Sequence, residues 1–341
     1  MRVGIAGCGF VANYHANAWR GVGAKVVAVC DVVEDKAKEF ALRHGVQRYF
    51  KSVEEMLDEV ELDVLSVCTP PKAHKQVALE AIERGISVFV EKPLVTSYPD
   101  AVDVVEMARS KNVKLGVTAN YLFTPTMVKA RDLIRRGSVG DLKRVDVIVY
   151  VPEDVILNAE GGWLESLPGG ALGEVLPHPI YLLQSLVGRL ELLSTSSAKT
   201  SKSNWQRHDE LHALFRGERG LGRVVISYNA KHFDIYVIAE GSSGFVLVNP
   251  LGKVVAKLSS SWRYWRNLFS FRHYAMLWLD YLLRRVPRDS FRENVRAFKE
   301  HVQRGSPYVF DYDDLLNQVK VYEEILNSLG RCATDVHDET R

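Results

Sequence analysis

Five short apolar runs alternate with amphipathic stretches over the first third of the chain. The runs are RVGIAG, KVVAVCD, DVLSVCTP, ISVFVEKP and VKLGVTAN. Their length and lack of polar alternation are typical of strands buried on both faces of a parallel sheet. Between them, stretches that open at Ser52 and Ser97 carry an acidic residue three positions later, as helix starts do. Residues 1–120 are therefore predicted to form an α/β domain with a doubly wound parallel sheet.

The pattern changes after about residue 140. The runs LKRVDVIVYV, ELHALFRG, GRVVISYNA, FDIYVIAEG and GFVLVNP follow one another with few helices between them, and glycine turns separate several of them. This favours a large, mostly antiparallel open sheet. The segment PTMVKARDLIRRG, ended by Gly137, is the first predicted helix of this part. We expect an α+β domain at 121–330, followed by a polar tail at 331–341.

Charge and cysteine content narrow the class of protein. The net charge of +2 gives no strong field for nucleic acid. The four cysteines form no Cys-x-x-Cys pair and no evident disulfide framework, so neither a metal site nor a disulfide-stapled fold is expected. The opening MRVGIAGCGF does not resemble a signal peptide, and no apolar run approaches the roughly 18 residues of a membrane span. We expect a cytoplasmic protein.

A glycine-rich loop follows the first predicted strand and opens a helix. It reads Gly7-x-Gly9-x-x-Ala12, with Phe10 and Val11 between. Gly7 would permit the tight turn, Gly9 would let the backbone approach a pyrophosphate, and Ala12 would allow close helix packing. This position predicts a dinucleotide site.

Asp31 closes the next strand, where an acid would meet the hydroxyls of the adenosine ribose. Its charge would repel a 2′-phosphate, which favours NAD while leaving NADP possible. A helix-capping role for Asp31 is compatible with this.

The strand ISVFV runs directly into Glu91, Lys92 and Pro93. Ligands of parallel sheets bind beyond the carboxyl ends of the strands, so this step is expected to line the cofactor crevice. A lysine beside a carboxylate keeps its charge and can orient a substrate hydroxyl or share its proton. Pro93 fixes the exit of the chain and could hold a cis bond. The alternative is a structural ion pair at the strand end.

The stretch TPPKAHKQVALEAIERGISVFVEKPL, residues 69–94, resembles the signature of the glucose–fructose oxidoreductase and inositol dehydrogenase family (Gfo/Idh/MocA). The glycine loop, the turn at 137–140 and EGSSGFVLV are also similar, and the resemblance covers roughly 1–255 and 294–328. It implies a Rossmann domain and a second domain at 121–330 for substrate binding and oligomer contacts. It also implies an NAD(P)-dependent oxidoreductase for sugars, cyclitols or related polyols, as a homodimer or homotetramer.

Carried over by position, the resemblance implies roles for single residues of the first domain. Lys92 matches the active-site lysine, with Glu91 as its neighbour. Thr69, Pro70 and His74 match the turn over the dinucleotide, and Asn120 matches a polar residue near the nicotinamide.

The stretch GGALGEVLPHPIYLL resembles the family's catalytic helix. Glu174, His178 and Tyr181 stand at its acid, histidine and acid positions, so His178 matches the catalytic base. Glu174 is longer than the usual aspartate, and Tyr181 has no carboxylate. Pro177 disfavours helical geometry at Leu176, so the active-site helix could instead start at Pro177.

Two aromatic residues are candidates for the substrate pocket. Tyr121 stands beside Leu122, where many relatives carry an arginine, and is expected to shape the pocket. Trp163, in EGGWLESLPGG, could offer a flat apolar face to a sugar ring, with simple packing as the alternative.

An aromatic and basic insertion spans 261–288. It is apolar on most faces of a helix, which favours packing across the second domain or in an oligomer interface. Attachment to an anionic membrane is the alternative interpretation, though a membrane surface is the less favoured partner.

The function predicted from these features is hydride transfer between a secondary hydroxyl of a sugar, cyclitol or nucleotide-sugar and a nicotinamide cofactor. Lys92 and His178 would handle the hydroxyl proton, with Glu174 tuning the pair. A non-catalytic dinucleotide-binding sensor on the same fold is the competing hypothesis.

Overall fold

A computed structural model describes residues 1–251, 254–259 and 289–331. The chain divides into two compact units. The first joins Met1–Asn120 to Phe291–Val319, and the second joins Tyr121–Ser290 to Lys320–Arg341. The predicted insertion at 261–288 lies outside the described residues, as does nearly all of the predicted tail.

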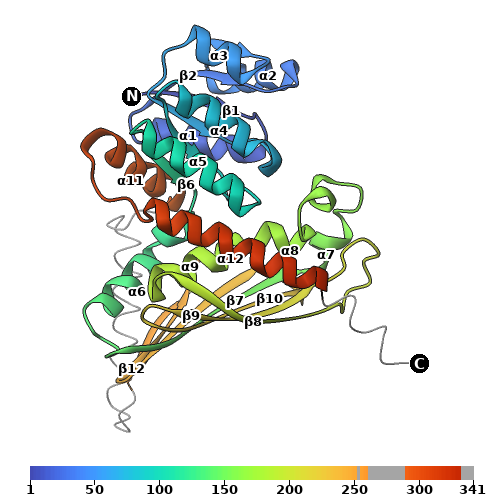
Figure 1. Ribbon diagram of the computed structural model, residues 1–341, viewed down its shortest axis with the longest axis vertical. Coiled ribbons are helices and arrows are strands. Elements are labelled where there is room, and N and C mark those ends of the chain that lie inside the picture. The colour runs from blue at the N-terminus through green and yellow to red at the C-terminus, as the bar shows by residue number, and fades with distance from the viewer. Residues whose placement is uncertain (252–253, 260–288, 332–341) are drawn as a thin grey trace. The chain divides into compact units, whose positions relative to one another are not determined.

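The first unit is a six-stranded parallel sheet of the order β3-β2-β1-β4-β5-β6 (Figure 1). In this doubly wound order, strands are added on one side of β1 up to β3 and on its other side from β4 onward. The expected Rossmann fold is therefore confirmed. Its strands are β1 (Arg2–Ala6), β2 (Lys25–Cys30), β3 (Arg48–Phe50), β4 (Val64–Val67), β5 (Ser87–Val90) and β6 (Leu115–Val117). Its helices are α1 (Phe10–Gly21), α2 (Glu34–His44), α3 (Val53–Glu59), α4 (His74–Glu83), α5 (Tyr98–Ser110) and α11 (Ser290–Arg304).

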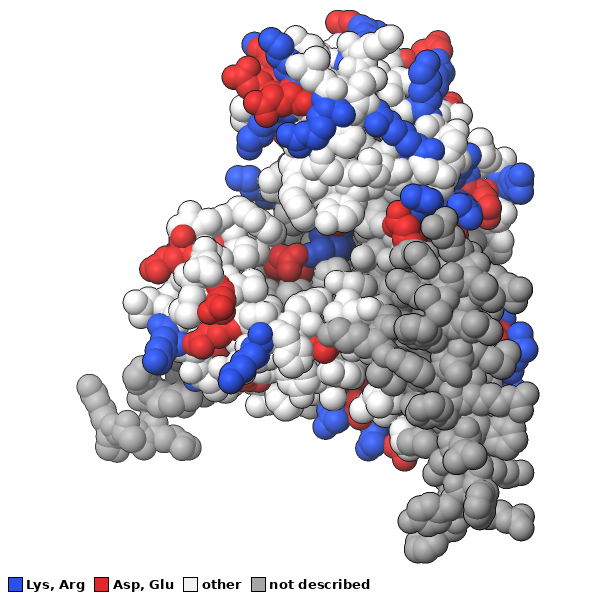
Figure 2. All heavy atoms as spheres, turned by 180° about the vertical axis from the view of Figure 1, so that it is seen from behind, with Lys and Arg blue, Asp and Glu red and all other residues white. Residues whose placement is uncertain are grey.

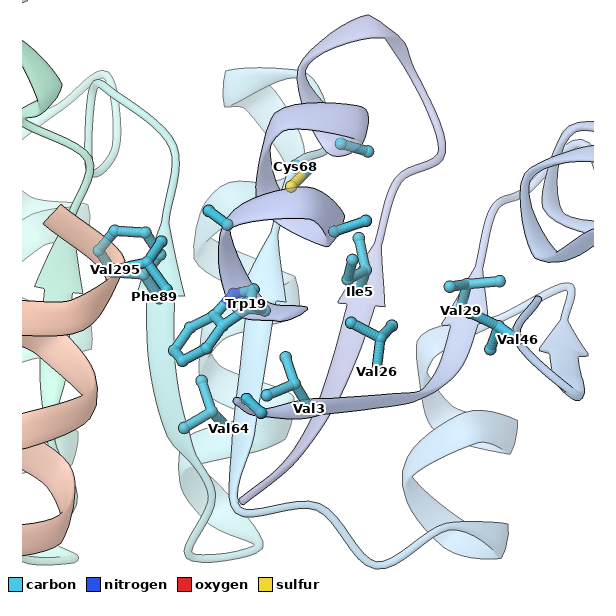
Figure 3. Close-up of a cluster of buried hydrophobic side chains, with 14 of the residues drawn as sticks. Val3, Ile5, Trp19, Val26, Val29, Val46, Val64, Cys68, Phe89 and Val295 are labelled. Atoms are coloured by element: carbon cyan, nitrogen blue, oxygen red, sulfur yellow. The ribbon is translucent and has the colours of Figure 1, made fainter. Parts of the chain in front are cut away.

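Helix α11 contributes side chains to the core of the first unit, although it follows the second domain in sequence. Phe298 stacks on Phe89 of β5 with ring centroids 5.0 Å apart, and Asn294 accepts a hydrogen bond of 2.8 Å from the backbone N–H of Ala119. Figure 3 shows Val295 of the same helix beside Phe89. The expected single range of 121–330 for the second domain is therefore wrong at Phe291–Val319, because this segment packs on β5 and β6.

The second unit is built on a seven-stranded sheet of the order β13-β12-β11-β7-β10-β9-β8. Strands β7 and β10 pair in parallel and the other neighbours are antiparallel, which confirms a mostly antiparallel sheet. The strands are β7 (Leu142–Pro152), β8 (Leu190–Ala198), β9 (Glu210–Gly217), β10 (Gly220–Ala230), β11 (Asp234–Gly241), β12 (Gly244–Asn249) and β13 (Val254–Ser259). Strand β8 was not predicted, because its serine- and threonine-rich second half lacks the apolar alternation of a half-buried strand.

Helices cover one face of this sheet. They are α6 (Pro125–Arg135), α7 (Glu153–Leu157), α8 (Gly170–Val175), α9 (Pro177–Val187) and the part of α12 (Tyr312–Arg331) that belongs to this unit. Helix α9 packs on β7 and β10, and nine of its residues are buried (Figure 1). His178 and Tyr181 are thereby carried by a helix that packs directly on the sheet.

The surface carries charges of both signs. Figure 2 shows lysines and arginines interspersed with aspartates and glutamates, in line with the small net charge. Of the helices in the described part of the chain, none combines the length and apolarity that crossing a membrane requires.

Candidate active site

The glycine loop of the first unit leaves β1 at Ala6 and enters α1 at Phe10. Gly7 has a φ of 90°, and a Cβ there would lie 2.7 Å from the carbonyl carbon and oxygen of Cys68. At Gly9 a Cβ would meet nothing within 4 Å, so the space in front of this residue is open. Ala12 is fully buried. The two glycines therefore differ: the fold itself requires Gly7, whereas Gly9 keeps a space clear.

The start of α1 presents backbone donors. Phe10 and Val11 form its first turn, no described side chain caps the helix at Gly9, and the first turn holds no acidic residue. The first N–H groups of a helix have no partner within the helix, and the helix dipole adds positive potential there. Because Phe10 is 80% exposed, this end of α1 is accessible. The loop and helix start together suit an anion such as a pyrophosphate.

Asp31 follows β2 and is held by two backbone donors. Its Oδ2 accepts from the N–H of Cys8 at 2.9 Å, and its Oδ1 accepts from the N–H of Val33 at 2.9 Å. These bonds fix the carboxylate against the glycine loop and leave lone pairs for ribose hydroxyls. Burial, together with the charge of Asp31, raises the pKa of the Cys8 thiol to about 12.

The turn after β4 carries Thr69 and Pro70, and His74 begins α4. The buried His74 ring lies between two backbone carbonyls: Nδ1 is 2.9 Å from the oxygen of Pro93 and Nε2 is 2.9 Å from that of Thr69. Burial lowers the pKa of His74, and a neutral imidazole can donate to only one of them. The buried Oγ1 of Thr69 has no hydrogen-bond partner among the described residues. This turn therefore holds a hydroxyl that a bound molecule could satisfy.

Glu91 and Lys92 follow the last residue of β5. Glu91 is only 7% exposed, and its Oε1 lies 2.7 Å from Nε2 of His15. Burial by itself would raise the pKa of Glu91, but the hydrogen bond and charge of His15, followed by the charge of Lys92 and a hydrogen bond from Thr118, outweigh it. The pKa of Glu91 therefore lies below its usual value. The Lys92–Pro93 peptide bond is cis. The glutamate is thus an anion at the end of a buried inner strand, with Lys92 next to it.

His15 was missed by the sequence analysis. Its position on α1 follows the buried spacing of Ala12, Ala16 and Trp19, which marks it as part of the inner face of the helix. Its partnership with Glu91 has no such local signal. Asn120, expected near a cofactor ring, lies half-buried just beyond β6.

The second unit brings four of the predicted residues together. The Nδ1 of His178 lies 3.0 Å from the hydroxyl oxygen of Tyr181, and the ring of Tyr121 lies 4.9 Å from the His178 ring. Burial, followed by the charge of Glu174, raises the pKa of Tyr121 to about 12, so its hydroxyl stays protonated near neutral pH.

The predicted start of the active-site helix at Pro177 is confirmed, since α8 ends at Val175 and α9 begins at Pro177. The expectation of non-helical geometry at Leu176 is wrong: its φ and ψ are −53° and −36°. Leu176 still donates to the carbonyl of Leu172 at 2.9 Å and accepts from Ile180. The interruption is therefore the N–H that Pro177 lacks, with the two helices nearly continuous across it.

Two further tyrosines that the sequence did not single out lie near Glu174. Burial and the charge of Glu174 raise the pKa of both Tyr228 and Tyr322. The Tyr228 hydroxyl donates to the carbonyl of Ala171 at 2.6 Å, whereas that of Tyr322 has no partner within the described part of the chain. Glu174 thus lies among protonated phenols, which are hydrogen-bond donors.

Trp163 lies in a short 3-10 helix, Trp163–Ser166, and is 54% exposed. This exposure does not favour the interpretation that it is a simple packing residue. In the described ranges, no group of three or more potential ligand side chains could hold a metal ion.

Comparisons with known proteins place both units in one family. A family model described as "Oxidoreductase family, NAD-binding Rossmann fold" matches residues 1–119, and one described as "GFO/IDH/MocA C-terminal domain" matches 127–246. The chain is 29% identical over 211 residues to an oxidoreductase of Formosa agariphila. The match covers 60% of this chain and 65% of that protein, which is just under two thirds of its length.

The chain is also 27% identical over 265 residues to dTDP-3,4-didehydro-2,6-dideoxy-alpha-D-glucose 3-reductase of Saccharopolyspora spinosa, covering 73% of this chain and 74% of that one. Among solved structures, the WlbA dehydrogenase of Bordetella pertussis in complex with NADH and UDP-GlcNAcA is similar in fold. Its TM-score is 0.81 at 20% identity, with 97% of this chain and 96% of that chain covered.

Proposed function

The chain belongs to the GFO/IDH/MocA family of oxidoreductases, and on that premise we propose that it uses NAD to oxidise, or in reverse to form, one secondary hydroxyl of a sugar, cyclitol or nucleotide-sugar. One observation carries the proposal. The first unit places an open glycine loop, an acid after β2 and a lysine after β5 at the carboxyl ends of one parallel sheet, where such sheets bind ligands.

The residues of the first unit fit a dinucleotide. The N–H groups at the start of α1, with the open space at Gly9, would hold the pyrophosphate. Asp31 would accept from the ribose hydroxyls and repel a 2′-phosphate, which favours NAD. The Oγ1 of Thr69, which no described residue satisfies, would be a further polar contact. When bound, the nicotinamide ring would supply the carbon that accepts or donates the hydride.

The remaining chemistry is the handling of the hydroxyl proton. Lys92 would orient and polarise the reacting oxygen with its positive charge. His178 would take the hydroxyl proton on Nε2 during oxidation, with its Nδ1–H donated to the Tyr181 oxygen 3.0 Å away. In this arrangement Tyr181 fixes the tautomer, a role for which a carboxylate is not required. Glu174 would tune the basicity of His178 through its charge.

A saccharide substrate is supported by two kinds of observation. The relative from Saccharopolyspora spinosa is named as a reductase of a nucleotide-linked deoxysugar. In this chain, the exposed ring of Trp163 offers a flat apolar face, and the hydroxyl of Tyr121 stays a donor at neutral pH. Sugar and cyclitol rings present apolar C–H faces, which suit the Trp163 ring, and hydroxyl groups, which suit the Tyr121 donor.

The proposal also covers the cellular compartment and the oligomeric state of the enzyme. Cys8, Cys30 and Cys68 are free thiols, in keeping with a reducing cytoplasm. We expect a homodimer or homotetramer, which light scattering coupled to gel filtration would measure.

A titration of the protein with NADH and NADPH, followed by a panel of sugars, inositols and nucleotide-sugars, tests the function. We expect tighter binding of NADH and turnover of at least one compound, lost by about 100-fold or more in His178→Ala. His212→Ala is the matched control, because His212 is exposed on β9 and should leave turnover unchanged. Binding of NADH without turnover on the whole panel would instead favour the non-catalytic sensor, and binding of neither nucleotide would overturn the cofactor assignment.

A further inference from the structure

A buried chain of polar side chains connects α1 to the Glu91–Lys92 step within the first unit. His15 of α1 has its Nε2 2.7 Å from Oε1 of Glu91 and its Nδ1 2.6 Å from Oγ of Ser66 on β4. The indole N–H of Trp19, one turn further along α1, donates to the same Ser66 oxygen at 3.1 Å. His15, Ser66 and Trp19 are all fully buried. The cluster links three elements through groups that water does not reach.

In the hydrogen bond between His15 and Glu91, the histidine is the donor. A carboxylate only accepts, so Nε2 of His15 carries the proton and donates to Glu91. Glu91 in turn accepts at its Oε2 from the backbone N–H of Lys92 at 3.3 Å. The two carboxylate oxygens therefore bind a side chain of α1 and the backbone of Lys92, and the Thr118 side chain is a further hydrogen-bond partner of Glu91.

Packing leaves the His15 ring little freedom. Its centroid is 5.7 Å from that of Phe89 on β5 and 4.8 Å from that of Phe291 on α11. A ring held by aromatic neighbours and by hydrogen bonds at both nitrogens donates along a fixed direction. The position of Glu91 is consequently set by α1, the same helix whose first turn faces the glycine loop.

We propose that His15 is a positioning residue that holds Glu91, and through it Lys92, in register with the dinucleotide-binding helix. The inference rests on the proposed function, in which Lys92 acts on the substrate oxygen. Without His15, the buried Glu91 carboxylate would turn toward the Lys92 amine, whose charge already acts on it. Lys92 would then be drawn from the substrate into an ion pair, while the loop around Gly9 would stay intact.

The test compares His15→Ala with His15→Gln, whose amide N–H can still donate to a carboxylate. We expect kcat to fall roughly 10- to 100-fold in His15→Ala, the effect of misplacing a catalytic group by about 1 Å. His15→Gln should recover most of this loss. The dissociation constant for NADH should change less than about threefold in both variants. Phe40→Leu is the control for destabilisation alone, because Phe40 is buried on α2, and it should keep kcat.

A double-mutant cycle isolates the contact. If His15 acts through Glu91, adding His15→Ala to Glu91→Gln should lower kcat little beyond the single change. Additive losses would overturn the proposal, as would full kcat in His15→Ala or an equal loss in the Phe40→Leu control.

A measurement that does not depend on substrate turnover tests the role of His15 separately from the proposed function. Acetylation of Lys92 at limiting acetic anhydride, followed by mass spectrometry of its peptide, reports the availability of the amine. We expect it to be at least about threefold slower in His15→Ala than in the wild type, because the ion pair with Glu91 withdraws the amine. Wild-type protein that turns over no substrate would refute the function. An unchanged or faster acetylation rate would refute the role of His15.

Discussion

Replacing Gly7 or Gly9 by alanine separates what the loop does for the fold from what it does for the cofactor. At Gly7 the new methyl group would lie 2.7 Å from the Cys68 carbonyl and 2.8 Å from the Thr69 nitrogen, and all of these are backbone atoms. The φ of 90° adds strain for any residue with a Cβ. At Gly9, with a φ of −78° and nothing within 4 Å, alanine fits the free protein.

The two substitutions are expected to affect the free energy of unfolding differently: Gly7→Ala should lower it, and Gly9→Ala should not. The left-handed backbone costs Gly7→Ala roughly 1–2 kcal/mol, and the overpacking costs roughly 1–3 kcal/mol more. The free energy of unfolding should therefore fall by about 2–5 kcal/mol. Gly9→Ala should be neutral or raise it by about 0.4–1 kcal/mol, because alanine has less freedom in the unfolded chain. Its methyl group would instead meet the bound pyrophosphate at a similar overpacking cost, which corresponds to NADH binding about 5- to 150-fold weaker.

Urea unfolding followed by tryptophan fluorescence measures the first effect, and an NADH titration of the folded protein measures the second. The reasoning about the open space fails if Gly9→Ala binds NADH as tightly as the wild type. The reasoning about the turn fails if Gly7→Ala is as stable as the wild type.

Three further predictions concern buried groups. Tyr322→Phe should be neutral or raise the free energy of unfolding by up to about 1 kcal/mol, because the Tyr322 hydroxyl has no partner among the described residues. Tyr228→Phe loses a 2.6 Å hydrogen bond and should lower the free energy of unfolding by about 1 kcal/mol. Equal effects of the two substitutions in urea unfolding would contradict this. Cys8, with a thiol pKa of about 12 against a usual 9.0, should react with iodoacetamide at pH 8 about 1,000-fold more slowly than a free cysteine, as peptide mass spectrometry would show; a rate within tenfold of a free cysteine would refute the burial argument. The pKa of Glu91 is lower in the folded than in the unfolded state, so its ionisation stabilises the fold above about pH 4.5 and this contribution is lost as the pH falls through the folded pKa. In His15→Ala the burial of Glu91 is offset only by Lys92 and Thr118, so the loss of unfolding free energy should be larger at pH 7 than at pH 4.5, and a loss that does not vary with pH would count against the pairing.

The local pattern of the chain determined much of the architecture. Strand–helix alternation, the glycine at the tight turn and the proline at the start of α9 are each properties of a few consecutive residues, and they predicted the doubly wound sheet and the helix boundary. Leu176 shows the limit of such rules, because its helical bonds to Leu172 and Ile180 outweighed the preference imposed by Pro177. Strand β8 shows another limit, since pairing with β9 made a strand of a polar segment.

Tertiary packing decided the features that join distant parts of the sequence. His15 and Glu91 are 76 positions apart, Ala119 and Asn294 are 175 apart, and no local period relates either pair. The sequence did show that Glu91 is an acid at the end of a buried strand, which implies that it needs a partner. Only the folded chain showed that the partner comes from α1, because the partner of a buried charge is chosen by which elements pack together. The same holds for Phe291–Val319, whose side chains complete a core that begins at residue 1.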